Sequence, residues 1–273
     1  MDNLVENKIE QLNQNGPDGS TLSGMVFAEE EDASGNSLGR KLSKKQILDN
    51  ALLLILAGSE TSAGTLTLAL MLLGIHTNVW DKIVEEQRVL VSKYGQSLTK
   101  SQLDKDCPYL DAVIRETMRI RPIDSGAPRV TRDTLVVDGT QIPKGYAVHF
   151  NIRLTHEMDP IARLGNSEHN DSNVNHDNVD FDHMDIYKGF QPERWLSEET
   201  KPKQDWMAFG YGPRYCLGAN LAMAEMKTFL SLLARKVDYK LVNDTNDIKW
   251  QRLSIIPKPL DGTLVQIKEK VAF

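Results

Sequence analysis

The chain has 273 residues, of which 40% are hydrophobic and 26% charged, a composition typical of a globular protein with one large domain or two small ones. The formal net charge of −6 and the lack of a dense basic stripe argue against nucleic-acid binding. Two cysteines, Cys107 and Cys216, are too few for a disulfide framework, so we expect a reducing compartment and at least one thiol available for chemistry.

The first 42 residues indicate a short helix and a loop that lead into the core. Residues 1–14 are polar and suit a helix, which the turn-forming run Asn15-Gly16-Pro17-Asp18-Gly19 then breaks. Residues 16–42 are expected to form a surface loop with an acidic patch at Glu29–Asp32. No signal-peptide pattern opens the sequence, although an upstream segment could still carry an anchor.

A long apolar helix is predicted from Ser43 to about His76. Ser43 and Gln46 form a capping-box pattern, and about 30 helical residues span roughly 45 Å, enough to cross a domain. The stretch Ala51–Gly74 is apolar enough to resemble a membrane span, but Glu60 inside it would be costly in lipid. A buried central helix is therefore favoured, with a membrane span as the alternative.

Three shorter helices are expected next, at residues 79–94, 98–105 and 108–120. The first is amphipathic and places Glu85 and Glu86 on its solvent side. In the third, Pro108 suits the first helical position and Pro122 ends the helix.

Short strands and one more helix complete the pattern, with strands at 134–137, 140–142 and 146–150 and a helix at 217–237. The turn Asp138-Gly139 favours a hairpin between the first two strands. The tail, residues 248–267, is expected to form a terminal β-hairpin around Pro257 and Pro259. The predicted fold class is therefore mainly α with small β-sheets.

Residues 163–187 differ from the rest, because Asn, Asp and His dominate and apolar residues are sparse. Such a composition predicts a disordered insert. It contains His169, His176 and His183 at intervals of seven residues. A metal site is conceivable, but a solvated loop is the favoured interpretation.

Cys216 lies in the segment Phe209-Gly210-Tyr211-Gly212-Pro213-Arg214-Tyr215-Cys216-Leu217-Gly218, just before the last predicted helix. A thiolate there would accept backbone N–H hydrogen bonds and interact with the positive end of the helix. It would stay deprotonated and could ligate iron. The alternatives are a buried structural cysteine or a chance match to the pattern Phe-x-x-Gly-x-Arg-x-Cys-x-Gly.

Two further motifs place charges on helices. Glu60 and Thr61, inside Ala57-Gly58-Ser59-Glu60-Thr61-Ser62, pair an acid with an alcohol and could relay protons, unless the hydroxyls only bond back to the preceding turn. Glu116 and Arg119 share one helical face.

If buried, this Glu116–Arg119 pair needs partners, and Arg194 in Pro192-Glu193-Arg194-Trp195 could complete an Arg–Glu–Arg cluster. A plain surface ion pair is the alternative.

In their order along the chain, over residues 43–270, these four motifs resemble those of the cytochrome P450 family. The Cys216 loop is the most specific of them. The resemblance implies the C-terminal part of the cytochrome P450 fold, a partial catalytic domain at residues 43–273 with a long central helix and a cysteine haem-ligand loop. Haem ligation by a cysteine thiolate is a known property of this family. The implied cofactor is heme b (iron protoporphyrin IX).

The resemblance also implies a role for each matching residue. Cys216 would be the axial ligand, with Phe209 and Gly210 in its loop, Phe209 shielding the sulfur, and Gly218 letting the next helix approach the porphyrin. Glu60 and Thr61 would be the catalytic acid–alcohol pair on the oxygen-binding face. The remaining implied roles are propionate pairing by Arg129 and Arg214, a structural ion cluster of Glu116, Arg119 and Arg194, and a structural role for His156.

The implied function is a haem-thiolate monooxygenase that inserts one atom of O2 into an apolar small molecule. Electrons would come from an NADPH-dependent flavoprotein reductase or a ferredoxin. The alternatives are a truncated, non-catalytic haem-binding fragment and an oxygen-independent isomerase of peroxides. Substrate contacts are expected from residues 57–61 and 123–128.

The resemblance also places this chain relative to the whole family. Members of the family carry roughly another half upstream, so membrane contact is expected only through that missing N-terminal segment. The location would be the cytosolic face of the endoplasmic reticulum membrane in a eukaryote and the cytoplasm otherwise.

Overall fold

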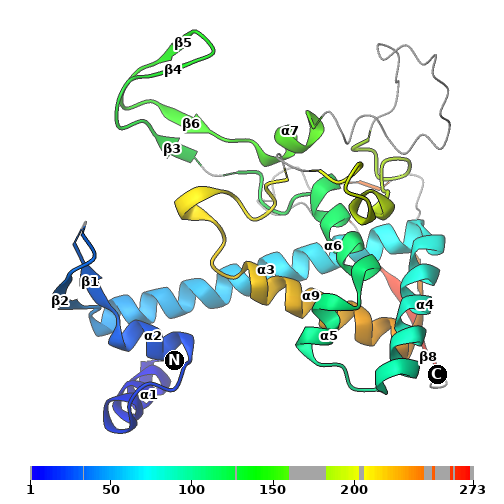
Figure 1. Ribbon diagram of the computed structural model, residues 1–273, viewed down its shortest axis with the longest axis horizontal. Coiled ribbons are helices and arrows are strands. Elements are labelled where there is room, and N and C mark those ends of the chain that lie inside the picture. The colour runs from blue at the N-terminus through cyan, green and yellow to red at the C-terminus, as the bar shows by residue number, and fades with distance from the viewer. Residues whose placement is uncertain are drawn as a thin grey trace. The chain divides into compact units, whose positions relative to one another are not determined.

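The computed structural model describes residues 2–32, 34–126, 128–159, 183–202, 206–242, 248–249, 259–260 and 262–270 (Figure 1). The expectations for His169, His176 and most of the insert lie outside these ranges. The chain divides into two compact units, residues 1–60 and 61–273, and the boundary falls inside the longest helix. The sequence predicts a division between a leading segment, residues 1–42, and the catalytic domain, which begins with the core helix. This domain boundary stays a prediction.

The first unit contains α1 (Asp2–Asn15), α2 (Thr21–Phe27), the strands β1 (Glu29–Glu31) and β2 (Ser37–Lys41), and the start of α3 (Lys44–Ile75). The expected helix at 1–14 is confirmed, but the surface loop expected at 16–42 is wrong. Ser20 caps α2 by accepting a hydrogen bond from Ser23 N at 3.1 Å. β1 and β2 pair antiparallel, with Arg40 and Glu30 in an ion pair at 3.1 Å. A small apolar core holds this unit together, made by Val5, Leu12, Val26 and Ile47.

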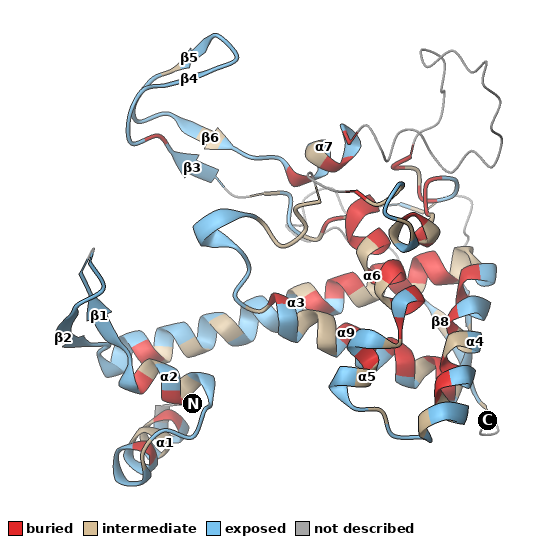
Figure 2. Cartoon of the chain, viewed as in Figure 1, coloured by how far each residue is buried: buried red, intermediate tan, exposed pale blue. Residues whose placement is uncertain are grey.

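The long helix α3 begins as its capping box predicts. Ser43 N donates to Gln46 Oε1 at 2.8 Å, and Gln46 N donates to Ser43 Oγ at 3.3 Å. Its C-terminal part is buried, including Leu68, Leu72 and Leu73, as Figure 2 shows. Among the described helices, α3 alone is long and apolar enough to cross a membrane, a test that core helices of soluble proteins also pass.

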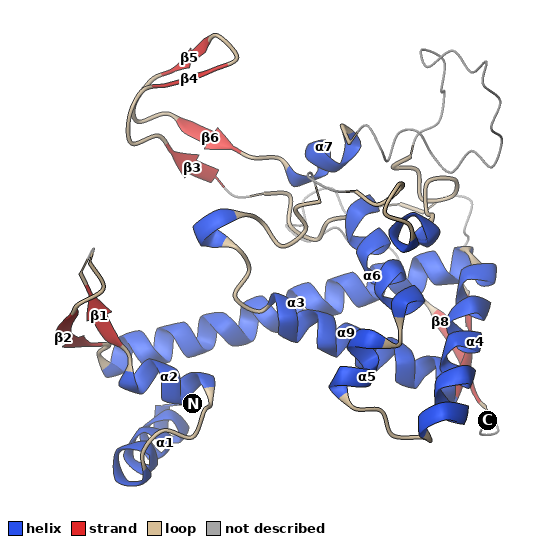
Figure 3. Cartoon of the chain, in the orientation of Figure 1, coloured by secondary structure: helices blue, strands red, loops and turns tan. Residues whose placement is uncertain are grey.

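Helices build the core of the second unit: α4 (Thr77–Tyr94), α5 (Lys100–Lys105), α6 (Pro108–Ile120), α7 (Ile152–Glu157) and α9 (Ala219–Lys236), with the short 3-10 helices η1 (Pro192–Leu196) and η2 (Gly212–Arg214). The predicted bounds of α6 are confirmed. This helix contributes most of its residues to the core and contacts α4, α9 and η1 (Figures 1 and 3).

The described residues of the second unit also form three antiparallel strand pairs: β3 (Pro128–Val130) with β6 (Ala147–His149), β4 (Leu135–Val137) with β5 (Thr140–Ile142), and β7 (Val237–Leu241) with β8 (Val265–Glu269). The predicted hairpin at Asp138-Gly139 is confirmed, and both residues have positive φ, 46° and 76°. Most of the expected terminal hairpin lies outside the described residues, although Leu260 N donates to Lys249 O at 2.6 Å. The described strand β8 pairs with β7, which follows α9 directly. β7 was missed because it follows the helix without an intervening turn signal.

Candidate functional site

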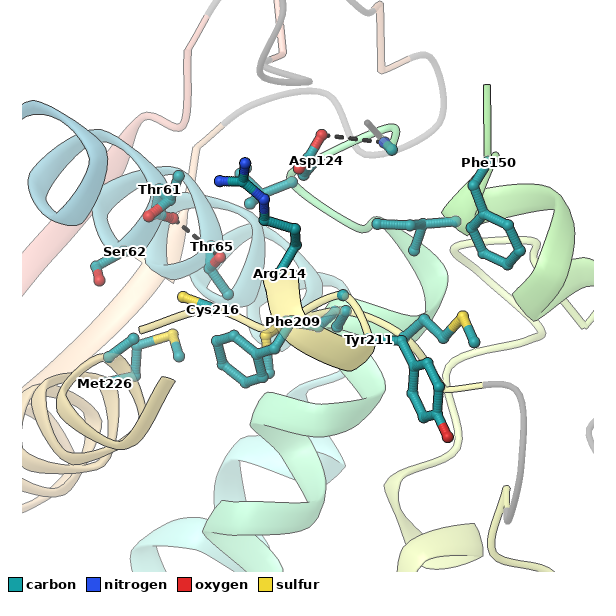
Figure 4. A pocket seen from close by; sticks show the side chains of 18 of the residues that line it. Thr61, Ser62, Thr65, Asp124, Phe150, Phe209, Tyr211, Arg214, Cys216 and Met226 are labelled. Atoms are coloured by element: carbon teal, nitrogen blue, oxygen red, sulfur yellow. Dashed lines mark hydrogen bonds between the residues drawn. The ribbon is translucent and has the colours of Figure 1, made fainter. Parts of the chain in front are cut away.

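A cavity of about 470 Å³ lies in the second unit, and several elements form its walls. They are α3, α6, α7, α9, β3, the loop residue Phe150 and the loops at residues 123–126 and 207–216. Figure 4 shows the Cys216 loop on one side and the hydroxyls of α3 on another. Six residues that the sequence marked line this cavity: Thr61, Arg129, Phe209, Gly210, Arg214 and Cys216.

The Cys216 loop is folded by its glycines and by local backbone hydrogen bonds. Gly210 and Gly212 have φ of 74° and 64°, a region that disfavours residues with a side chain. Gly210 N donates to Met207 O at 2.8 Å, and Cys216 N donates to Phe209 O at 2.9 Å. The loop therefore returns on itself and holds Cys216 beside Phe209.

The two cysteines have opposite environments. Cys216 is exposed and lies three residues before the first residue of α9. Cys107 is fully buried, and its sulfur accepts a hydrogen bond from Gln87 Nε2 at 3.7 Å. Burial raises the pKa of the Cys107 thiol to about 11, so this side chain stays a neutral thiol at physiological pH. Of the two cysteines, Cys216 is therefore the candidate metal ligand.

Another wall of the cavity is a hydroxyl-bearing face of α3. Thr65 Oγ1 donates to Thr61 O at 3.0 Å, a bond back to the preceding turn. Ser62 Oγ donates to Glu225 Oε2 on α9 at 3.3 Å. Glu60 is exposed, belongs to the first unit and does not line the cavity. The structure therefore brings Thr61, but not Glu60, to the cavity.

A tightly packed turn forms another part of the wall, next to two cationic side chains. Gly126 has φ of 125°, and a Cβ there would lie 1.7 Å from Phe150 O, so only glycine fits. Arg129 and Arg214 are exposed, and Arg129 Nη1 donates to Pro128 O at 2.9 Å. In Figure 4 the side chain of Arg214 leaves the Cys216 loop toward the side where Asp124 and Thr61 lie.

The structure forms the Arg–Glu–Arg cluster in the core. Glu116, Arg119 and Arg194 are each at most 1% exposed. Glu116 accepts hydrogen bonds from Arg119 Nε at 2.8 Å and from Arg194 Nε at 3.0 Å. It also accepts from Trp195 Nε1 at 2.9 Å and Gln191 N at 2.9 Å. Burial alone would raise the pKa of Glu116, but the two guanidinium groups and these donors hold it below its usual value.

The same cluster corrects the expectation for His183. This residue is 4% exposed, and its Nδ1 lies 3.0 Å from Arg119 Nη1. Arg119 Nη2 also donates to His183 O at 2.8 Å. Met184 and Ile186 are buried as well. The end of the expected insert is therefore part of the core, and the alternating apolar residues Met184 and Ile186 were the available signal.

Glu86, expected on the solvent side of its helix, instead caps another helix. Its two carboxylate oxygens accept hydrogen bonds from Tyr109 N at 2.7 Å and Leu110 N at 3.1 Å, which are unsatisfied donors at the start of α6. Burial raises the pKa of Glu86 to about 7, against the effect of these hydrogen bonds. The amphipathic pattern of α4 could not show a partner on a separate helix.

The sequence of the chain matches that of a known protein family over most of its length. The sequence profile described as Cytochrome P450 matches residues 1–160 and 188–264. The chain belongs to the cytochrome P450 family. The match includes the first 42 residues, which the resemblance had left out, and it omits residues 161–187, where the sequence predicts an insert.

Individual relatives agree with this assignment. Cytochrome P450 26B1 of Rattus norvegicus is 30% identical over 243 residues, which cover 85% of this chain and 42% of the relative. Putative cytochrome P450 120 of Synechocystis sp. is 30% identical over 87% of this chain and 50% of the relative. The chain thus spans about half the length of the curated relatives it matches.

Solved structures confirm the predicted fold class. The structure titled "Retinoic acid bound cyanobacterial CYP120A1" has a TM-score of 0.76 and 28% identity, and the match covers 98% of this chain and 55% of that one. A structure titled "Crystal structure of cytochrome P450DA heme domain", at 23% identity and a TM-score of 0.74, supports the fold alone.

The family implies a haem cofactor, and the residues of the cavity fit one. Cys216 presents an exposed sulfur. Apart from Gly218 itself and its neighbours in the chain, no described atom lies within 4 Å of the position that a Cβ would take there, which leaves open space beside the start of α9. The walls supplied by Phe209 and Met226 are apolar, and the two arginines can pair with carboxylates.

Proposed function

We propose that the complete protein is a haem-thiolate monooxygenase that inserts one atom of O2 into an apolar small molecule. One observation supports this most: a single cavity is lined by an exposed cysteine, Cys216, and by the hydroxyl-bearing residue Thr61. A haem with a thiolate ligand supplies oxygen activation and oxidation of C–H bonds when bound.

The residues around Cys216 would hold the cofactor, heme b. Cys216 is its ligand in this proposal, and Phe209 shields the sulfur from water. The positive φ of Gly210 supports its role in shaping the loop. Gly218 has no side chain, so it leaves space for the cofactor beside the start of α9. The rim arginines, Arg129 and Arg214, pair with the two propionates.

Thr61 would handle protons on the substrate side of the cavity. Its hydroxyl can accept a hydrogen bond from one water and donate to another, so that a proton moves along the chain of waters. Glu60, its neighbour, would supply protons from solvent, which its exposure supports. The buried cluster of Glu116, Arg119 and Arg194 would act structurally, behind the haem.

An apolar substrate is supported by the surface of the cavity, which is mainly apolar and includes Ile123, Phe150 and Met118. A solved relative at 28% identity carries retinoic acid in its title, so retinoids are the first ligands to test. Electrons would come from an NADPH-dependent flavoprotein reductase or a ferredoxin. Membrane attachment through an upstream segment would place a eukaryotic protein at the endoplasmic reticulum.

The test is a haem titration of the chain, followed by reduction and addition of carbon monoxide. A thiolate ligand shifts the Soret band strongly to longer wavelength. We expect this shift in the wild type and in Cys107→Ser, and its loss in Cys216→Ser. A thiolate spectrum that survives in Cys216→Ser would assign the ligand to another residue and remove the proposal.

A second candidate function is a non-catalytic haem-binding protein. It is supported by Leu52, Leu53, Ile55 and Leu56 on α3, which are 43–61% exposed, and by the half-length match to the relatives. Haem uptake without electron transfer from either class of reductase would favour this candidate. A peroxide isomerase is less well supported, because the acid–alcohol pair at Glu60 and Thr61 suits proton delivery.

A further inference from the structure

His156 connects the end of α6 with the start of the Cys216 loop. It lies in the last turn of α7 and is 1% exposed. Its Nδ1 is 3.1 Å from Arg119 O, and its Nε2 accepts a hydrogen bond from Met207 N at 2.9 Å. The imidazole thus joins two backbone groups from segments far apart in the sequence.

The partners fix the protonation state of the ring. A backbone carbonyl can only accept a hydrogen bond, so Nδ1 must carry a proton and donate to Arg119 O. A backbone N–H can only donate, so Nε2 must be unprotonated and accept from Met207. A protonated ring would place two donors, Nε2–H and Met207 N–H, against each other. The structure therefore requires neutral His156 with its proton on Nδ1.

Three hydrogen bonds and the peptide link between Phe209 and Gly210 connect this ring to Cys216. Met207 donates to the ring, and Met207 O accepts from Gly210 N at 2.8 Å. Phe209, between these two residues, accepts from Cys216 N at 2.9 Å. Each of these loop residues lines the cavity. The position of Met207 N–H therefore determines where the loop begins and, through two further bonds, where Cys216 lies.

Aromatic contacts support the same loop but do not fix its register. Trp195, which donates to Glu116, meets Trp206 edge to face with ring centres 5.5 Å apart. Trp206 meets Phe209 in the same way at 5.9 Å. Ring packing of this kind tolerates small shifts along the chain, whereas the bond from Met207 to His156 has one donor and one acceptor.

The charged groups around His156 have opposing effects on the pKa of its ring. Arg119 from α6 opposes protonation of the ring, while Glu116 from α6 and Asp159 after α7 favour it. Behind them, Arg194 from η1 pairs with Glu116 and His183 contacts Arg119. Burial prevails, and it lowers the pKa of His156 to about 4. The neutral ring that the hydrogen bonds require is thus the form present at physiological pH.

We infer that His156 is a positioning residue for the candidate ligand loop: its neutral imidazole holds Met207 N–H against the end of α6 and so sets the position of Cys216. This inference goes beyond the proposed function, which gives His156 no part in placing the ligand. The test below needs no haem, so its failure and the failure of the haem spectrum are distinguishable.

The test compares amide hydrogen exchange, residue by residue, in the wild type and three variants. His156→Phe keeps a ring but removes both hydrogen bonds, and His156→Gln keeps one donor and one acceptor. His149→Phe is the matched control, because His149 is exposed on β6. In His156→Phe we expect roughly tenfold faster exchange at Met207, Gly210 and Cys216, as for the loss of one hydrogen bond, with unchanged exchange at the core residue Leu230.

The remaining variants and the wild-type ring give independent readouts. His156→Gln should restore most of the protection at Met207, and His149→Phe should change nothing in the loop. Long-range nitrogen–proton NMR of the wild type should place the imidazole proton on Nδ1 at neutral pH. Protection at Met207 should fall as the pH drops toward 4 in the wild type but not in His156→Gln, which retains every nearby carboxylate.

Two results would overturn the inference. One is a folded His156→Phe variant in which Met207, Gly210 and Cys216 keep their protection. The other is a ring proton on Nε2 in the wild type, because the bond from Met207 would then be absent. If His156→Phe does not fold, the NMR assignment of the ring proton and the pH series in His156→Gln decide whether His156 positions the loop.

Discussion

Thr61 is the residue whose role in the proposed reaction is most open to a direct test. Thr67 lies on the same helix, bonds back to Ala63 O at 2.8 Å and does not line the cavity. We expect Thr61→Ala in the complete protein to release several-fold more hydrogen peroxide for each reducing equivalent, because proton delivery fails. Thr67→Ala is the control and should leave this ratio unchanged. Unaltered coupling in Thr61→Ala would exclude the hydroxyl from proton transfer.

Glu86 predicts a pH dependence of stability with a definite sign. Its pKa is raised from 4.5 to about 7 in the folded protein, so the fold binds a proton that the unfolded chain has released. The contribution of Glu86 to the free energy of unfolding should therefore fall as the pH rises from about 4.5 to 7, by at most about 3 kcal/mol. His156, whose pKa is lowered from 6.5 to about 4, contributes with the opposite sign in nearly the same range. Urea unfolding across that range should therefore show a stability difference between wild type and Glu86→Gln that falls as the pH rises.

The neighbouring residue provides the control for Glu86. Glu85 is exposed and pairs with Arg88 on the surface, so Glu85→Gln should keep the slope of the wild type. A difference in unfolding free energy between wild type and Glu86→Gln that stays constant across this pH range would mean that Glu86 does not carry the pH dependence.

At the scale of elements, the ion cluster fixes α6 against η1 and the segment that begins at residue 183. Arg119→Ala would leave Glu116 with one guanidinium partner in the core. We expect a loss of about 3–5 kcal/mol of unfolding free energy, enough to abolish stable folding. Arg115→Ala on the same helix removes a partly exposed pair with Asp111 and the contact of its guanidinium with the Trp206 ring, 5.0 Å from the ring centre, and should cost about 1–2 kcal/mol. Chemical denaturation of both variants, followed by circular dichroism, measures the difference.

The helices with explicit end signals were predictable from the sequence. The capping box at Ser43 gave the start of α3, and Pro108 gave that of α6. β1 was not predictable in the same way, because its residues, Glu29–Glu31, are poor strand formers. Cross-strand ion pairs to Arg40 and Lys41, which only the pairing creates, compensate for this.

The candidate site follows the same division between local and long-range information. The order and spacing of residues in the Cys216 loop are local, and the loop lines the cavity as a local motif allows. The partners of His183 and Glu86 lie 64 and 23 residues away in the chain. The sequence alone does not distinguish such polar residues from solvent-exposed ones, because their partners come close only in the folded chain.

At the scale of the whole molecule, the distribution of apolar surface is uneven. The exposed leucines of α3, Leu53 at 59% and Leu56 at 61%, contrast with Leu72 at 0% on the same helix. We expect the chain to bind a hydrophobic dye and to self-associate, because exposed apolar patches favour association. Leu53→Gln and Leu56→Gln should reduce dye binding with little change in stability, as is usual at exposed positions.

Leu72→Gln is the matched control for these two variants. It should cost about 3 kcal/mol or more, because it leaves a polar amide in the core. Equal destabilisation by all three variants would show that the exposed leucines are packed in solution.

The pairing of β7 with β8 has a consequence for synthesis of the chain. β7 ends at residue 241, and its described partner spans residues 265–269. Until residues 265–269 have left the ribosome, β7 stays an unpaired edge that neighbouring nascent chains can join. Chaperones that shield open strands during translation should therefore raise the yield of native protein.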